Sequence, residues 1–122
     1  MDLVTNKIND IQELCLDIYG RYDIDKSMLW MAEEFGEVIA AIRKGKSKND
    51  ICGEIGDLTA WIISICNILN IELSSAIKAT IQKEMNRQLR AYGKLKYAQS
   101  EEREKLLLDM LHSIENERDK IG

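Results

Sequence analysis

The sequence predicts an all-α protein, an antiparallel bundle of four core helices followed by a C-terminal helix. The chain of 122 residues contains no proline and only seven glycines, whereas proline normally supplies about 5% of residues. Apolar residues recur at three- and four-residue spacing, which is the period of a helix, and no stretch alternates as a strand would. At this length we expect one domain with a substantial core.

The first two helices are expected at residues 3–19 and 27–44. Gly20 is a suitable stop for the first helix, and a short polar segment leads to the second. Ser27 is the candidate N-cap of the second helix, and Gly45 lies just past its end. The apolar positions of the first helix that follow the helical period are Ile8, Ile11, Leu14, Cys15 and Ile18.

The other three helices are expected at residues 47–69, 73–92 and 100–120. Ser47 and Asp50 have the spacing of a capping box at the start of the third helix. The breaks that follow the third and fourth helices are expected at Asn70 and Gly93. Because the turn between the second and third helices is short, these two helices should be antiparallel neighbours.

The composition argues against several classes of partner. Lys and Arg number 17 against 21 Asp and Glu, which gives a net charge of −4, and a nucleic-acid-binding domain would instead be basic.

The cysteines are odd in number and lack CxxC spacing, so we expect three reduced core thiols, Cys15, Cys52 and Cys66, in a cytoplasmic protein. The N-terminus has no signal-peptide core. The apolar segment 58–71 is too short for a membrane span, so we expect a buried core helix and no membrane partner.

Two clusters of carboxylates stand inside apolar helical segments. Glu33, Glu34 and Glu37 form the first cluster, and Glu54 and Asp57 form the second. Since a helix advances about 100° per residue, each cluster shares one side of its helix, and antiparallel packing would bring five acids to one spot. Ionised carboxylates cannot remain there without compensation. An all-oxygen ligand set suits Mg²⁺ or Mn²⁺, so the sequence predicts a metal site built from two helices.

Three glycines, Gly36, Gly53 and Gly56, stand beside these carboxylates. Glycine destabilises a helix interior by about 1 kcal/mol relative to alanine, so they indicate a close approach of backbone or ligand. One alternative is a non-catalytic helical oligomerisation protein with the acids on a solvated or structural face. A ferritin-like di-metal site would need Glu-x-x-His motifs, which the acidic segments lack. The one histidine, His112, lies far along the chain, and no Ser-His-Asp or Cys-His nucleophile can be proposed.

The pattern E-E-F-G-E at 33–37 followed by E-I-G-D at 54–57 resembles the signature of the MazG-like all-α nucleoside triphosphate pyrophosphohydrolases. That superfamily includes dimeric dUTPases and phosphoribosyl-ATP pyrophosphohydrolases. The likeness covers about residues 5–95 and extends to a Lys-Asn-Arg cluster in the fourth helix. It implies a core at residues 1–98 and a helical extension of the same domain at 99–122.

The resemblance implies an Mg²⁺-dependent enzyme, with Mn²⁺ as a substitute. Such an enzyme hydrolyses the α–β phosphate linkage of a nucleotide, releases a monophosphate and pyrophosphate, and can serve to remove non-standard nucleotides. By the resemblance, Glu34, Glu37, Glu54 and Asp57 would hold the ion. Glu33 would be an additional ligand, or would orient or deprotonate the attacking water. A dUTP-type or phosphoribosyl-ATP pyrophosphohydrolase is the alternative within the same superfamily.

Five further side chains are candidates for substrate binding. Lys83 and Arg87, one turn apart, could meet the triphosphate with Asn86 beside them, or could form an ordinary solvated face. Trp61 lies one turn after the second acidic cluster, and Trp30 one turn before the first. Either tryptophan could stack on a nucleobase, or it could belong to the core.

The last helix carries an apolar stripe. Four short helices around an acidic site leave little room for a substrate pocket, so we expect a homodimer or a dimer of dimers. The last helix should contribute apolar contact to that assembly. Its stripe consists of Leu107, Met110, Leu111 and Ile114, with Leu106 and Leu108 beside it.

Overall fold

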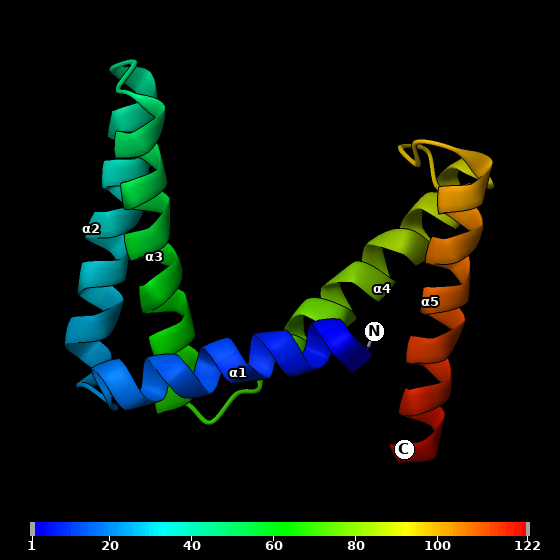
Figure 1. Ribbon diagram of the computed structural model, residues 1–122, viewed down its shortest axis with the longest axis horizontal. Helices are drawn as coiled ribbons and strands as arrows, with labels where there is room; N and C mark the ends of the chain where they lie inside the picture. The colour runs from blue at the N-terminus through cyan, green and yellow to red at the C-terminus, as the bar shows by residue number, and fades with distance from the viewer. Residues whose placement is uncertain (1, 122) are drawn as a thin grey trace. The chain divides into compact units, whose positions relative to one another are not determined.

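The computed structural model describes residues 2–121, and describes side chains from residue 5 to residue 116. This part of the chain forms five α-helices and no strand (Figure 1), so the predicted all-α fold is confirmed. The helices are α1 (Asp2–Tyr19), α2 (Ile24–Arg43), α3 (Lys48–Ile68), α4 (Leu73–Tyr92) and α5 (Glu101–Ile121).

Most of the predicted helix ends are confirmed by local backbone geometry. The Ser47 hydroxyl accepts a hydrogen bond from the Asp50 N–H at 3.1 Å, and the Ser100 hydroxyl accepts one from the Arg103 N–H at 3.1 Å. Both serines therefore cap the helix that follows them. The predicted stops share a positive φ, the left-handed conformation that ends many helices: 66° at Gly20, 65° at Gly45, 55° at Asn70 and 71° at Gly93.

The prediction that Ser27 caps the second helix is wrong. The helix begins earlier, at Ile24, and its N-cap is Asp23, whose carboxylate accepts a hydrogen bond from the Lys26 N–H at 2.8 Å. Ser27 is fully buried within the first turn, and its hydroxyl donates to the Asp23 carbonyl at 2.7 Å. Aspartate is as good a cap as serine and also interacts favourably with the helix dipole, which explains the choice.

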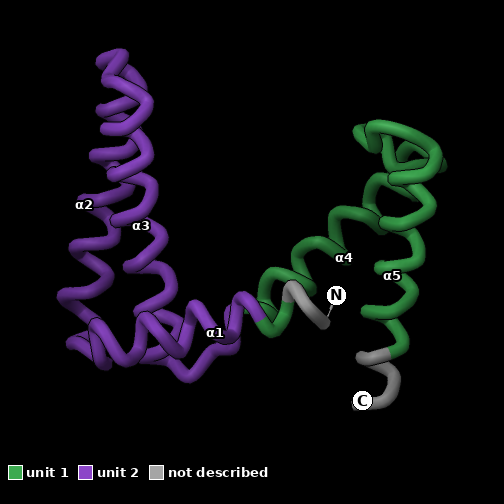
Figure 2. Tube along the Cα trace, in the orientation of Figure 1, with its two compact units in different colours: residues 1–6, 74–122 green, residues 7–73 purple. Residues whose placement is uncertain are grey.

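The chain divides into two compact units, Lys7–Leu73 and Met1–Asn6 together with Ser74–Gly122 (Figure 2). In the first unit, α2 and α3 run antiparallel and side by side, as their short connection predicted (Figure 1). This pair of helices carries both acidic clusters.

Polar contacts fix α1 to the far end of α3 within the first unit. The side-chain amide of Gln12 donates to the Ile71 carbonyl at 2.8 Å and its oxygen accepts from the Leu73 N–H at 3.0 Å. The Asn67 amide donates to the Gln12 carbonyl at 3.2 Å, and Arg21 donates to the Asn67 carbonyl at 3.1 Å. These bonds satisfy polar groups at the end of α3 and position the segment that leads into α2.

In the second unit, α5 packs against α4 and the connector that joins them. Met85, Leu95 and Leu111 form a buried cluster there. The Glu104 carboxylate accepts a hydrogen bond from the Leu95 N–H at 3.1 Å and fixes the connector to α5. Leu111 and Ile114 of the predicted apolar stripe are buried, so part of that stripe is covered within the chain.

The expectation of three core thiols is wrong in part. All three cysteines are free, but only Cys66 is buried, whereas Cys15 is half-buried and Cys52 is exposed. Apolar sequence context does not determine burial at these positions, because each helix turns only one side toward its neighbour.

The expectation of a buried helix over residues 58–71 also needs correction. The helix ends at Ile68, and Leu69 and Ile71 beyond it are exposed. Only one side of its second half is buried, at Ile63, Ser64, Cys66 and Asn67. Since α3 begins at Lys48, it is long and apolar enough, by length and composition alone, to cross a membrane. The core helix of a soluble protein passes the same test.

Candidate functional site

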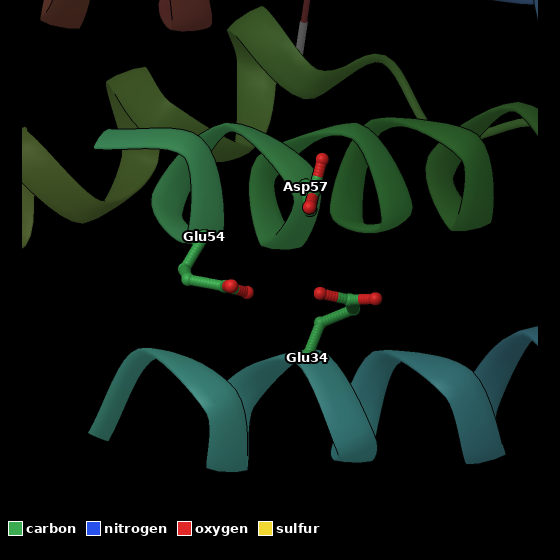
Figure 3. A group of neighbouring side chains, drawn as sticks. All are labelled: Glu34, Glu54 and Asp57. Carbon is green, nitrogen blue, oxygen red and sulfur yellow. The ribbon is translucent and has the colours of Figure 1, made fainter. Parts of the chain in front are cut away.

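Three carboxylates meet between α2 and α3. Glu34 extends from α2 toward Glu54 and Asp57 on α3 (Figure 3), and one oxygen of each lies within 4.8 Å of the others. Glu54 and Asp57 share a face because they are three residues apart on one helix. Mg²⁺ binds oxygen at about 2.0–2.1 Å, so its ligand atoms lie up to about 4.2 Å apart. Small side-chain adjustments would let these three oxygens hold one such ion.

The electrostatics of this cluster favour a cation. Burial, followed by the charge and hydrogen bond of Glu37, raises the pKa of Glu34 above its ordinary value. A hydrogen bond with Glu37, followed by burial, raises the pKa of Glu54. The Oε2 atoms of Glu34 and Glu54 are buried and have no hydrogen-bond partner among the described residues. A buried oxygen without a partner is costly, and an all-oxygen donor set fits a hard divalent ion.

The other two predicted acids have different positions. Glu37 interacts with both Glu34 and Glu54, since it contributes to the raised pKa of each. Glu33 is exposed and is not one of the three clustered acids. The structure thus brings four of the five predicted acids to one place, and the geometry gives no support to Glu33 as a metal ligand. Its role toward water stays a prediction.

The expected close approach of backbone to the three glycines is not found among the described residues. A Cβ atom built at Gly36, Gly53 or Gly56 would have no neighbour within 4 Å. A side chain at these positions would therefore meet no steric obstacle among the described residues.

An aromatic pocket of about 460 Å³ adjoins the carboxylates. Glu34 and Asp57 line it together with Tyr22, Trp30 and Trp61. The Trp30 ring stacks on Tyr22 with centroids 5.5 Å apart, and Trp30 and Trp61 form a T-shaped contact with centroids 5.4 Å apart. Both tryptophans therefore line a cavity instead of filling the core, since Trp30 is 38% exposed and Trp61 is half-buried.

Sequence reasoning missed Tyr22 as a member of this pocket. The residue stands in a polar link directly before the Asp23 cap, where no helical periodicity indicates its direction. Two large tyrosines, Tyr19 and Tyr22, at a helix-to-helix turn were the available signal.

A second pocket of about 430 Å³, here called the loop-side pocket, lies toward the turn between α2 and α3. Its lining includes the acids Asp50, Glu54 and Asp57 together with Lys46 and Asn49. Asp57 lines both pockets. The carboxylates therefore adjoin both an aromatic cavity and a cavity that a lysine side chain helps to line.

The family model for the MazG nucleotide pyrophosphohydrolase domain matches residues 23–90. The chain belongs to this family. No curated protein and no solved structure matches it. The match begins at the Asp23 cap of α2 and includes α3, so it contains the whole carboxylate cluster and the two tryptophans. The family-level activity is nucleotide pyrophosphohydrolysis, which confirms the resemblance inferred from the two acidic motifs.

The MazG match also includes the basic residues predicted to meet the phosphates. Lys83 and Arg87 are exposed and Asn86 is half-buried on α4. Arg87 donates from Nε to Glu84 Oε2 at 2.7 Å. This hydrogen bond, with one from Gln88, lowers the pKa of Glu84 to about 2. Since α4 belongs to the second unit, a role for these residues toward the substrate stays a prediction.

Proposed function

We propose that this MazG protein is an Mg²⁺-dependent nucleoside triphosphate pyrophosphohydrolase that cleaves the α–β phosphate linkage. The observation that carries the proposal is the meeting of Glu34, Glu54 and Asp57, with two unpartnered buried oxygens, at the edge of an aromatic pocket. A cavity of this size suits a nucleobase, and the carboxylates beside it suit the metal ion that accompanies a triphosphate.

The chain's own residues have distinct tasks in this proposal. Glu34, Glu54 and Asp57, with Glu37 beside them, would hold the ion, Mg²⁺ or its substitute Mn²⁺. When bound, such an ion neutralises charge on phosphate oxygens. Glu33 remains the candidate that orients or deprotonates the attacking water.

The aromatic side chains fix the other end of the substrate. Trp61 and Trp30 offer surfaces on which a base can stack, and Tyr22 supports Trp30 from its other side. Lys83, Asn86 and Arg87 are proposed to bind phosphate oxygens. The three free cysteines are compatible with a cytoplasmic location, which we propose for this protein.

A panel of nucleoside triphosphates, dUTP and phosphoribosyl-ATP, incubated with Mg²⁺, tests the proposed reaction. We expect a monophosphate and pyrophosphate as products, Mn²⁺ to support turnover, and excess EDTA to abolish it. Separate assays for pyrophosphate and orthophosphate identify the bond that breaks. Stepwise release of orthophosphate, or full activity in EDTA, would contradict the proposal.

We further propose that the protein is a homodimer or a dimer of dimers. Large apolar side chains are exposed on both helices of the antiparallel α2–α3 pair, here called the hairpin. Exposed apolar surface usually marks an interface where it is contiguous. These side chains include Phe35, Ile39 and Ile42 on α2 and Ile55 and Ile62 on α3, each more than 40% exposed.

Light scattering at micromolar concentration tests this assembly. We expect the parent protein to have at least twice the chain mass, and Ile42→Lys to shift it toward monomer because a charge would be buried at the interface. His112→Lys, a matched change at an exposed position of α5, should leave the mass unchanged. A monomeric parent protein would rule the assembly out.

A further inference from the structure

The contacts across the hairpin place the aromatic pocket and the loop-side pocket at different levels along its axis. Trp61 follows Asp57 by four residues, which is about 6 Å of helix rise, and it meets Trp30 across the pair. In the opposite direction, Glu54 precedes Asp57 by three residues, about 4.5 Å of rise, and interacts with Glu37. The order along the axis is therefore aromatic rings, carboxylates and then the α2–α3 turn.

Two of the residues that line the loop-side pocket are small, which leaves space between the helices. Ala41 of α2 and Gly53 of α3 line it, and a Cβ atom at Gly53 would meet nothing within 4 Å. Its volume of about 430 Å³ is close to that of the aromatic pocket. A phosphate chain that leaves the carboxylates in the direction of the turn would enter this space.

The backbone fixes the position of Lys46, one of the residues that line the loop-side pocket. The Lys46 N–H donates to the Ala41 carbonyl at 3.0 Å, and the Gly45 N–H donates to the Ile42 carbonyl at 3.1 Å. Together with a φ of 65° at Gly45, these bonds form a Schellman motif that ends α2. The next residue, Ser47, caps α3. Lys46 is thus held between two capped helix ends, although its side chain is exposed.

The loop-side pocket carries more negative than positive charge, so it should bind phosphate as a complex with a metal cation. Asp50, Glu54 and Asp57 line it against the single cation of Lys46, so a bare anion would be repelled. An ion shared with the carboxylates would remove this repulsion, and Lys46 and Asn49 could then donate hydrogen bonds to phosphate oxygens.

We propose that the nucleotide lies along the hairpin axis, with its base in the aromatic pocket and its β- and γ-phosphates in the loop-side pocket, bound by Lys46 and Asn49. This inference rests on the proposed function and adds the orientation in which the nucleotide lies along α2 and α3. The α-phosphorus then lies where the two pockets meet, beside Asp57. Water attacks that phosphorus, and the bond from the α-phosphorus to the bridging oxygen breaks, so that this oxygen leaves with pyrophosphate. A proton of the water is released to solvent, either directly while Glu33 orients the water or by way of the Glu33 carboxylate.

Calorimetric titration of the separate products tests the direction directly, with Mg²⁺-pyrophosphate and a nucleoside monophosphate as probes. Lys46→Ala should weaken Mg²⁺-pyrophosphate binding about tenfold, as the loss of a charge-assisted hydrogen bond predicts, and should leave monophosphate binding unchanged. Trp61→Ala should weaken binding of the nucleoside monophosphate and leave binding of Mg²⁺-pyrophosphate unchanged. Lys44 and Lys48 are each two residues from Lys46 in the sequence and do not line the pocket. Lys44→Ala and Lys48→Ala therefore remove the same charge as matched controls and should leave both affinities unchanged.

A second variant tests the same pocket by filling it. Gly53→Leu should abolish Mg²⁺-pyrophosphate binding, while the melting temperature stays equal or rises because leucine is the better helix former. The proposal is overturned if the parent protein does not bind Mg²⁺-pyrophosphate, if Lys46→Ala binds it as the parent does, or if Lys46→Ala weakens both products equally. Failure of the proposed function is a separate result, namely a parent protein that releases orthophosphate or cleaves no triphosphate.

Discussion

Glu54→Gln is expected to lower the rate of triphosphate hydrolysis by about 10²–10³-fold, the loss typical of removing one preorganised polar group from an active site. The metal-free protein should nevertheless be at least as stable as the parent. Glutamine has the shape of a protonated glutamate and can donate a hydrogen bond to Glu37, the neighbour that contributes most to the raised pKa of Glu54. Steady-state kinetics and thermal unfolding in EDTA measure the two effects.

The pH dependence of stability gives the same variant a second measurement. The pKa values of Glu34 and Glu54 are raised from about 4.5, so the native state binds protons more tightly than the unfolded state. Stability without metal should therefore fall as pH rises through about 4.5 toward the raised values, and stay low above them. The melting temperature of the parent in EDTA should decrease between pH 4 and pH 7, and that of Glu54→Gln should decrease less.

Magnesium should reverse this loss in the parent protein, because the ion binds the ionised carboxylates of the folded state. At about 100 times its Kd, a ligand adds about 2.7 kcal/mol to the free energy of unfolding, and Glu54→Gln should forfeit most of that gain. Glu33→Gln makes the same chemical change outside the clustered acids, so it should keep the gain. If Glu54→Gln instead melts several degrees below the parent in EDTA, the carboxylates are structural partners and the metal site is wrong.

Trp61→Ala is expected to raise KM about five- to hundredfold, since stacking of a base on an aromatic ring contributes about 1–3 kcal/mol. The Mg²⁺-dependent gain in melting temperature should be nearly unchanged, because the carboxylates keep their positions on α2 and α3. Trp61→Phe retains a ring and should recover most of the affinity. Circular dichroism checks the fold, and a collapsed Trp61→Ala variant would show that this side chain supports the core.

Helix positions and ends follow closely from the sequence because they depend on local interactions. Ser47 and Ser100 are within one turn of the N–H groups that they cap, and Gly45 and Gly93 follow directly on the helices that they end. The start of α2 was misplaced because Asp23 and Ser27 are both good caps within one short segment. The carboxylate of Asp23 also interacts favourably with the helix dipole, which favours it as the cap, and Ser27 is then buried within the first turn.

The sequence by itself determined the family and the acidic motifs, because residues three and four apart on a helix share a face whatever surrounds them. Only the tertiary structure decided which acids meet, since rotation of α2 against α3 places Glu34 in the clustered group and leaves Glu33 exposed. It also decided that Trp30, Trp61 and Tyr22 line one pocket and that Lys46 lines another. These contacts join residues far apart in the chain, so their geometry depends on how two helices pack and not on the period of either one.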